Sequence, residues 1–496
     1  MILPRKRKDK EIANLNLDIS FSVFILALYN LVSFSIRIFS VCVLPARHNP
    51  SIAMTWLLVI FFWPIPGGLL YLGLGSTKLP AERIKRHENA LERLEETLEK
   101  YPPLKKPDLP EHLSDISTLS EKLGNWPLQY AREMEMIYSQ KELVEKMVND
   151  INAAKRTVTL LYYIFNRDYM TEPLIKALKH AVKRGVHCYV LLDDLGSKKF
   201  LKKDGEELIK AGINLRRALP LSRLKRTPLT ARYDLRNHRK LAVIDCEIGY
   251  MGSHNMTEPS YGGKARGKKW EDLTMRFTGP IVGHLQGIFL QDWYVETDQV
   301  LVDCIPSPPE EENLKYPLQT VPSGPAYKTQ NYQRLVSSAL FQAREQVIIT
   351  TPYLIPDEGL LQALEVACLN GTRVDLVVPE RSDQFLAGNA SKAYFSKLMD
   401  IGVNIYLYNP GILHAKTITI DDDLAFFGSS NFDIRSFALN FEINMVLYGK
   451  KETSELRKAQ QRYISKANLV KKTEWENRRI PIKTLQGISK LLSPIL

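Results

Sequence analysis

The stretch "NHRKLAVIDCEIGYMGSHN" (237–255) places charged side chains at the start of an otherwise apolar pair of expected strands. A second stretch, "LHAKTITIDDDLAFFGSSN" (413–431), repeats the layout with different filler residues. Each copy has His, one residue, Lys, four residues, Asp, and then Gly-Ser-x-Asn, and every matched position is offset by 176 residues. We therefore expect a duplicated unit with one site in two parts, built from His238, Lys240, Asp245, Ser253 and Asn255 in the first copy and His414, Lys416, Asp421, Ser429 and Asn431 in the second.

The segments before each motif also correspond. Strand, helix ending at Gly, strand, helix and strand precede both motifs, an order that predicts an α/β fold with right-handed crossovers. Proline-rich breaks at 101–113 and 305–325 separate the parts of the chain. We expect a basic cytoplasmic tail at 1–18, two transmembrane helices at 19–76, a charged helix and Pro-rich linker at 77–124, a first α/β domain at 125–304, a linker at 305–326 and a second α/β domain at 327–496.

The amino-terminal region predicts attachment to a membrane. Residues 52–74 run for 23 residues without a charge, long enough to cross a hydrocarbon core of about 30 Å as a helix. Pro64 and Pro66 would kink or break that helix. A buried globular helix is the alternative interpretation of this segment.

Residues 21–44 form the other expected span, with a reentrant or interfacial helix as the alternative. Because Arg37 is costly at a bilayer centre, we expect it to reach one surface or face the partner helix. Basic residues precede the first span and follow the second, and the connecting loop holds only Arg47 and His48. The positive-inside rule then predicts a multi-pass protein of the cell membrane whose catalytic domains are cytoplasmic.

Composition favours an anionic partner and chemistry without a bound metal or cofactor. The formal net charge of +12 suits nucleic acid, a phospholipid surface or a phosphorylated substrate. The five cysteines form no CxxC pair, which fits a reducing compartment. The nine histidines form no HExxH motif and no cluster with ligand spacing.

The residue types of the motif suit phosphoryl transfer. Alternate residues of a strand share a face, so each His lies beside its Lys. One histidine can attack phosphorus while the other donates a proton to the leaving oxygen, and the Lys and Asn side chains can neutralise and orient the phosphoryl oxygens. The small Gly-Ser pairs would let the backbone approach a ligand. Asp245 and Asp421 lie an odd number of residues after the His and Lys of their motifs, so they do not share the face of those side chains. For these aspartates a role in a turn is as well supported as a chemical one.

These residues resemble the phospholipase D superfamily, whose hallmark is a pair of HxKxxxxD motifs. The stretches 236–240, 428–442 and 50–75 are similar to those of bacterial cardiolipin synthases. The resemblance implies two pseudosymmetric phospholipase D-type α/β/α domains and transfer of a phosphatidyl group from one phosphatidylglycerol to another, with release of glycerol. It implies His238 as the nucleophile that forms a phosphohistidine, His414 as general acid and base, and Asp272 and Glu442 as carboxylates that orient the histidines.

Other functions remain open at this stage. A phospholipase D hydrolase would use water as the acceptor on the same phosphoenzyme. A nuclease with the same motifs would also be basic, but the two expected spans count against a nucleic-acid partner. In a non-catalytic membrane scaffold, the site would bind anionic phosphate without catalysing a reaction. The basic segment 216–236 either attracts anionic membrane lipids or is a solvated loop.

Overall fold

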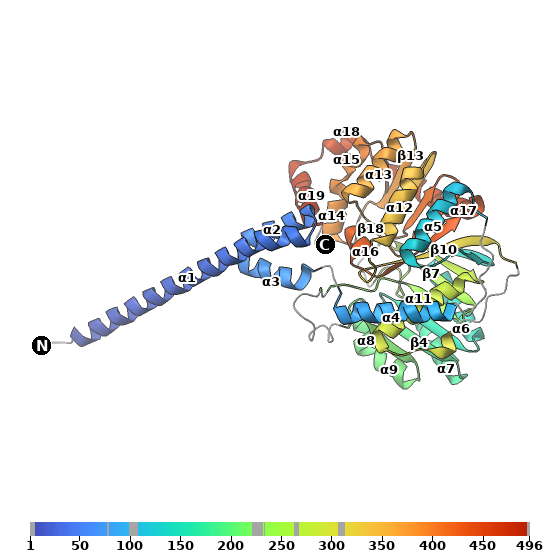
Figure 1. Ribbon diagram of the computed structural model, residues 1–496, viewed down its shortest axis with the longest axis horizontal. Coiled ribbons are helices and arrows are strands. Elements are labelled where there is room, and N and C mark those ends of the chain that lie inside the picture. Colours follow the sequence, from blue (N-terminus) through green and yellow to red (C-terminus); the bar gives the residue numbers. More distant parts are fainter. Residues whose placement is uncertain are drawn as a thin grey trace. The chain divides into compact units, whose positions relative to one another are not determined.

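The computed structural model describes residues 5–76, 79–98, 108–220, 232, 234–261, 267–305 and 313–493. It divides into two units, of which one holds the amino-terminal helices up to Ser76 and the other holds the α/β body (Figure 1). Much of the proline-rich stretch 101–113 and of the basic segment 216–236 lies outside the described residues. The expectations for those parts remain predictions.

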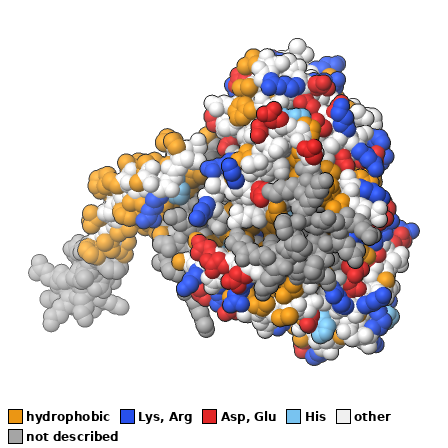
Figure 2. Space-filling model, turned by 45° about the vertical axis from the view of Figure 1, so that its right-hand side comes forward, with side chains coloured by type: hydrophobic (Ala, Val, Ile, Leu, Met, Phe, Trp, Pro, Cys, Tyr) orange, Lys and Arg blue, Asp and Glu red, His pale blue; other side chains and the backbone are white. Residues whose placement is uncertain are grey.

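The described amino-terminal unit consists of helices α1 (Arg5–Arg47), α2 (Pro50–Phe62) and α3 (Pro64–Leu74). Within α1, Ser22–Arg47 is long and apolar enough to cross a membrane by length and composition. Many hydrophobic side chains lie exposed on the described part of this unit (Figure 2). Since α1 begins at Arg5, most of the expected tail 1–18 is helical backbone.

The second expected span, 52–74, is divided into α2 and α3, at the prolines that were expected to kink or break it. The chain leaves the helical region at Trp63 (φ −133°, ψ 79°), next to Pro64 and Pro66, which cannot donate backbone hydrogen bonds. Arg37 Nη2 donates to the carbonyl of Phe61 in the last turn of α2, at 3.1 Å. Arg37 therefore faces the partner helix α2, which is one of the two placements expected for it.

The first half of the body is built on a seven-stranded sheet in the order β2-β9-β7-β6-β3-β4-β5. Strands β3, β4 and β5 are parallel, and the other pairs are antiparallel. The strand bounds are β2 Glu133–Ile137, β3 Thr157–Tyr162, β4 His187–Asp193, β5 Asn214–Ala218, β6 Leu241–Ile244, β7 Ile248–Gly252 and β9 Thr274–Thr278. Helices α6 (Gln140–Ala153) and α7 (Glu172–Lys183) pack on one face, and α11 (Ile281–Thr297) packs on the other.

The second half repeats this order within a nine-stranded sheet, β1-β10-β19-β17-β16-β11-β13-β14-β20. The seven strands from β10 through β19, β17, β16, β11 and β13 to β14 occupy the places of the seven strands of the first sheet, taken from β2 to β5 in their spatial order. Strands β1 and β20 are added at the edges. Their bounds are β1 Gln129–Ala131, β10 Tyr316–Ser323, β11 Gln346–Thr350, β13 Arg373–Pro379, β14 Asn404–Tyr408, β16 Thr417–Ile420, β17 Leu424–Gly428, β19 Glu442–Tyr448 and β20 Ala467–Leu469. The expected mixed α/β fold with two related halves is confirmed.

The two halves share one hydrophobic core. Residues from both sheets, together with α11 and α17 (Lys450–Ile464), form a single buried cluster between the halves. Phe277 and Phe427, one from each sheet, lie with ring centroids 6.1 Å apart. Separate clusters under α6 and α7, and under α12 (Asn331–Gln342) and α13 (Glu358–Leu369), fill the outer face of each sheet. The halves therefore pack face to face.

Strand β10 lies inside the range 305–326 that the sequence suggested as a linker. It pairs with β19 over its middle and carboxyl-terminal part and with β1 over its beginning. Helix α5 (Glu111–Gly124) likewise falls within the expected linker 77–124, after helix α4 (Ala81–Leu98). Leu113 and Ile116 of α5 are buried in the core of the second half, so these connecting segments are also structural elements of the body.

Candidate active site

Two equivalent hairpins position the paired motifs. Strands β6 and β7 pair with Leu241 opposite Met251, and β16 and β17 pair with Thr417 opposite Phe427. The two His-x-Lys segments lie just before β6 and β16, not within these strands as expected. Each hairpin therefore holds its His-x-Lys segment at the edge where the two halves meet.

The imidazole of His414 is held by a carboxylate from the other half of the chain. Nδ1 of His414 lies 2.6 Å from Oδ1 of Asp272, and Asp272 is almost fully buried. Ser253 Oγ donates to the same carboxylate oxygen at 2.6 Å, and Tyr261 OH lies 3.4 Å from the other oxygen. This arrangement fixes the orientation of the His414 ring.

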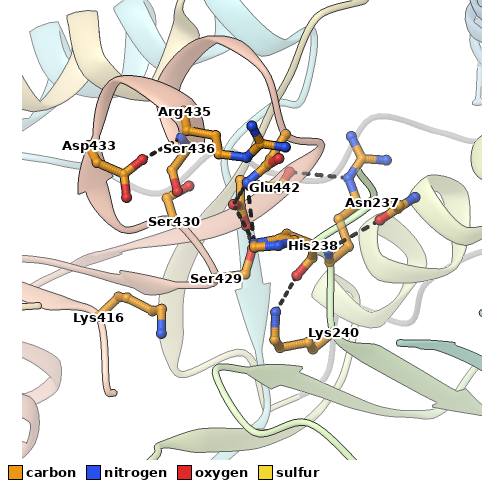
Figure 3. Close-up of polar contacts among 12 residues, drawn as sticks. Asn237, His238, Lys240, Lys416, Ser429, Ser430, Asp433, Arg435, Ser436 and Glu442 are labelled. Carbon is orange, nitrogen blue, oxygen red and sulfur yellow. Dashed lines mark hydrogen bonds and ion pairs between the residues drawn. The ribbon is translucent and has the colours of Figure 1, made fainter. Parts of the chain in front are cut away.

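The imidazole of His238 has the reciprocal arrangement. Nδ1 of His238 lies 3.3 Å from Oε1 of Glu442, which is fully buried in the second half (Figure 3). Ser429 Oγ donates to Oε2 of Glu442 at 2.6 Å. Nδ2 of Asn440 also lies 3.3 Å from Nδ1 of His238. Each histidine thus depends on a carboxylate that the other half supplies.

Backbone pairing between the halves creates this exchange. Strand β15 (Ile412–Leu413) pairs in parallel with β8 (Trp270–Glu271), and Asn237 forms a parallel bridge with Phe441. As a result, the amide of His414 donates to the carbonyl of Glu271, and the amide of His238 donates to the carbonyl of Phe441, both at 2.8 Å. The two histidines are therefore placed by matching hydrogen bonds across a pseudo-twofold arrangement.

Both lysines lie in the same cluster. Lys240 Nζ donates to the carbonyl of His238 at 2.5 Å, and Lys416 Nζ donates to the carbonyl of His414. Figure 3 shows Lys240 and Lys416 approaching each other from the two halves beside His238. Burial lowers the pKa of Lys416 to about 7, where Asp272 opposes the shift and Lys240 adds to it. The charges of the two halves therefore act on one another directly.

The electrostatics favour neutral imidazoles beside ionised carboxylates. Burial lowers the pKa of His414 to about 4, with Lys416 acting in the same direction and Asp272 opposing it. Burial also lowers the pKa of His238, against the effect of Glu442. Burial alone would raise the pKa of Asp272 and of Glu442, but the neighbouring histidine brings each below its usual range.

The geometry leaves one nitrogen of each ring available. Because Nδ1 faces a carboxylate, it carries the proton, and Nε2 keeps its lone pair. The side chains of His238 and His414 are 20% and 12% exposed, whereas those of Glu442 and Asp272 are 0% and 2% exposed. The open side of the cluster is therefore the side of the imidazoles, which suits attack on a bound electrophile.

Asp245 and Asp421 do not join this cluster. Asp245 accepts hydrogen bonds from the backbone amides of residues 155, 156 and 157, at 2.8–2.9 Å, and Asp421 accepts from the amides of residues 344, 345 and 346. Both have a positive φ, 53° and 45°, in the turn after the motif strand. Of the two roles left open for these aspartates, the contacts favour the structural one, since the carboxylates hold the starts of β3 and β11.

The expected substrate-binding serines face the carboxylates and not an open cavity. Ser253 and Ser429 hydrogen-bond to Asp272 and Glu442, as described above, so they position the carboxylates. The preceding glycines permit close approach of a neighbouring strand. A Cβ at Gly252 would lie 2.3 Å from the carbonyl of Leu273.

The two asparagines have different environments. Asn255 Oδ1 accepts from the amide of Ile164 at 3.2 Å, and its Nδ2 donates to Tyr261 OH at 3.0 Å. Its side chain is thus engaged within the protein. Asn431 is 8% exposed, and its buried Oδ1 has no hydrogen-bond partner among the described residues. Of the two, Asn431 is therefore the one whose side-chain oxygen is not engaged by a described residue.

Aromatic residues close to the histidines are a part of the site that the motif spacing does not indicate. The Tyr163 ring lies 4.0 Å from the His238 ring, between centroids. Trp270 lies edge-on to His414 at 4.5 Å and stacks on Tyr261 at 4.1 Å. The spacing of the motifs points to neither Tyr163 nor Trp270.

A buried ionic network supports the segment that carries His238. Arg239 is fully buried and donates to Oδ1 of Asp292 at 2.6 Å and to the carbonyl of Glu442 at 3.1 Å. Asn237 Nδ2 donates to the other oxygen of Asp292 at 2.8 Å, and its amide donates to Asp193 at 3.0 Å. Breaking such a buried pair would leave an uncompensated charge. The network therefore restricts the positions of the two residues that flank His238.

Comparison with known proteins agrees with this architecture. The family model described as "Cardiolipin synthase, PLD-like domain" matches residues 147–293 and 336–464, one match in each half. The chain is 32% identical over 461 residues to cardiolipin synthase A of Pectobacterium atrosepticum, covering 91% of this chain and 94% of that protein. It is 32% identical over 464 residues to cardiolipin synthase A of Wigglesworthia glossinidia brevipalpis, covering 91% and 92%.

A solved structure shares the fold. The phosphatidylserine synthase of Haemophilus influenzae Rd KW20 aligns with a TM-score of 0.57 at 15% identity, over 77% of this chain and all of that one. The fold and the paired His/Lys clusters define an enzyme with two phospholipase D-like domains. The chain belongs to the cardiolipin synthase family of such proteins, and the expectation of a phosphatidyltransferase is confirmed at the level of this family.

Proposed function

We propose that the chain is a membrane-anchored cardiolipin synthase that transfers a phosphatidyl group from one phosphatidylglycerol to another and releases glycerol. The observation that carries the proposal is the crossed pairing of His238 with Glu442 and of His414 with Asp272, beside Lys240 and Lys416. Two such pairs supply a nucleophile and a proton donor for one phosphodiester.

In the first step, Nε2 of His238 attacks phosphorus and the bond from phosphorus to the glycerol oxygen breaks. His414 gives its proton to that oxygen, and glycerol leaves. In the second step, a hydroxyl of another phosphatidylglycerol attacks the phosphohistidine, His414 takes the hydroxyl proton, and the phosphorus–nitrogen bond breaks. The products are cardiolipin and the free enzyme, so each proton and bond is accounted for.

The charges of the cluster suit a phosphodiester. When both lysines are protonated, their charges balance those of Glu442 and Asp272. A bound phosphodiester adds one negative charge, which favours protonation of an imidazole whose pKa burial has lowered. His414 has the shorter contact with its carboxylate, 2.6 Å against 3.3 Å for His238, which supports His414 as the proton donor.

Membrane anchoring is proposed from the amino-terminal unit. The stretch Ser22–Arg47 is one candidate span, and α2 with α3 would return through the bilayer as a broken span. The contact of Arg37 with the Phe61 carbonyl supports this, because a broken membrane helix needs partners for its freed carbonyls. The catalytic body would then lie on the cytoplasmic side, as the basic residues on both flanks predict.

A direct test is to incubate the purified full-length protein with phosphatidylglycerol in EDTA and to identify the products. Cardiolipin with an equal amount of glycerol would support the synthase. Phosphatidic acid without cardiolipin would replace it by a hydrolase, and loss of turnover in EDTA would contradict chemistry by the histidines alone. Reporter fusions at residue 48 and at the carboxyl terminus test the topology, since the proposal places them on opposite sides of the membrane.

A further inference from the structure

The carboxyl-terminal helix α19 (Ile480–Leu492) presents its apolar side to solvent. The exposed residues Ile480, Ile482, Leu485, Ile488 and Leu491 have exposed fractions of 77%, 43%, 38%, 52% and 60%. The residues of α19 that are buried are polar, Gln486 at 4% and Ser489 at 0%. A helix of a soluble body normally has the reverse arrangement, so this surface is suited to a further partner.

Polar contacts fix this orientation. Arg478 lies over the ring of Trp475, with 3.5 Å from Cζ to the ring centroid, and its Nη1 donates to Oε1 of Gln486 at 2.5 Å. Lys490 Nζ lies 4.2 Å from the centroid of the Tyr394 ring. These contacts tie the polar side of α19 to the body, so rotation of the helix to bury its leucines would break them.

The patch extends onto a neighbouring helix. α19 packs against α14 (Phe385–Ala393), as Figure 1 also shows. Phe385 and Leu386 at the start of α14 are 66% and 40% exposed. We call the exposed apolar residues of α14 and α19 the carboxyl-terminal patch; they are Phe385, Leu386, Ile480, Ile482, Leu485, Ile488 and Leu491.

The charged residues within and directly beside α19 are basic. Residues 477–496 contain Arg478, Arg479, Lys483 and Lys490 but no Asp or Glu. Arg479 and Lys483 are exposed, and neither forms an ion pair with a residue that the structure describes. An exposed apolar helix side with a basic flank complements the acyl boundary and the headgroups of an anionic bilayer.

The patch also lies close to the catalytic cluster. Helix α14 begins two residues after Asp383, whose carboxylate accepts a hydrogen bond from Tyr353 OH. The negative charge of Asp383 acts to raise the pKa of His414 and of Lys416, which places this carboxylate near both. The end of the patch at Phe385 therefore lies near the catalytic cluster.

We propose that the carboxyl-terminal patch docks on the surface of an anionic lipid bilayer, as a second membrane contact besides the amino-terminal helices, and brings the active site to its lipid substrates. The docking adds to the proposed function. It depends on that function in one respect, that the substrates are lipids of the same bilayer. The acyl boundary receives Ile488 and Leu491, and the headgroups meet Arg479 and Lys483.

The kinetic test uses the full-length protein with Ile488→Glu and Leu491→Glu together. On phosphatidylglycerol in vesicles, turnover is expected to fall by about tenfold or more, because two charges enter the docking side. On a short-chain phosphatidylglycerol dissolved as monomers, turnover should change less than about twofold. Leu369→Glu, at a leucine 78% exposed at the end of α13, is the matched control and should leave both rates unchanged. Unchanged turnover on vesicles, or equal loss on both substrates, would overturn the proposal.

A second measurement does not depend on turnover. Hydrogen exchange of residues 480–492 is compared for the full-length protein in nanodiscs of phosphatidylglycerol and of phosphatidylcholine. Exchange should be about threefold slower or more in the anionic bilayer, and Lys483→Glu with Arg479→Glu should remove the difference. Equal exchange in both lipids would overturn the docking and point to another cover, such as the chain's own helices or a second copy. If the protein made no cardiolipin but still showed the lipid-dependent protection, the proposed function would fail and the docking would stand.

Discussion

Nδ1 of His414 lies 2.6 Å from Oδ1 of Asp272, although 142 residues separate them in the chain. His238 and Glu442 repeat the contact in the opposite direction, between the first half and the second. Each half therefore contains a histidine that it cannot orient by itself. A carboxylate that bonds one imidazole nitrogen fixes the tautomer and stabilises the imidazolium, so packing of the two halves and activation of the site are one event.

Asp272→Asn should lower kcat by about 10–100-fold with little change in KM, because the amide no longer stabilises the imidazolium of His414. The neighbouring Glu271→Gln is the matched control. Glu271 contacts His414 through its backbone carbonyl, which this substitution keeps. Steady-state kinetics on phosphatidylglycerol distinguish the two variants, and equal losses in both would refute a specific role for the Asp272 carboxylate.

His414→Ala should accumulate phosphatidyl-histidine at His238. Without the second imidazole no group takes the proton of the acceptor hydroxyl, so the second step slows more than the first, whose leaving oxygen can still draw a proton from solvent. Mass spectrometry of peptides kept at neutral to alkaline pH, where phosphohistidine survives, should find the modification at residue 238. His238→Ala should give no modified peptide. Label on His414 in the wild-type protein would reverse the two roles.

Asp421→Ala should destabilise the protein by about 2 kcal/mol or more, because three backbone amides lose a charged acceptor. The adjacent Asp422→Ala is the control, since that side chain is 55% exposed and pairs, among the described residues, with Arg457 at 2.8 Å. It should cost less than Asp421→Ala, because it removes one ion pair of a half-exposed carboxylate and leaves no backbone amide without its acceptor. Thermal unfolding measures both, and turnover per folded molecule at low temperature should remain close to the wild-type value. An Asp421→Ala protein that is stable but inactive would restore the catalytic assignment.

The sequence suffices to predict the duplicated halves and the four central His and Lys residues, because repeated spacing reports on local geometry that both copies share. The crossed carboxylate pairs could not be predicted in this way. They depend on the parallel pairing of β15 with β8 and on the bridge between Asn237 and Phe441, contacts between segments far apart in the chain. Periodicity within one segment contains no information on such contacts.

Two differences from expectation are caused by the position of a neighbouring strand. Pro317 and Pro322 made the segment of β10 resemble a linker, yet β10 pairs with β19 along Leu318–Ser323 because tertiary pairing outweighs propensity. Ser253 next to Gly252 suggested a ligand-binding turn. The same small residues serve close approach of β9, and only the position of the neighbouring strand separates these interpretations.

The pKa of Lys416 predicts how activity depends on pH. Burial lowers it to about 7, so in the free enzyme Lys416 is mostly charged below pH 7 and mostly neutral above it. In the proposed mechanism the ammonium group stabilises the phosphodiester and its transition state, so kcat/KM should fall as the pH rises through about 7, by up to tenfold per pH unit. The wild-type profile between pH 5.5 and 9 should show this descending part.

Lys416→Arg separates this cause from others. A guanidinium stays charged throughout this range, so the variant should have a lower kcat/KM at pH 6, through its altered geometry, but no decrease between pH 7 and 9. The lipid substrate and the vesicle composition are kept constant across the series, because the phosphodiester itself does not titrate there. If the variant retained the wild-type decrease at the same pH, another group would cause it, and the role of Lys416 as the titrating cation would be refuted.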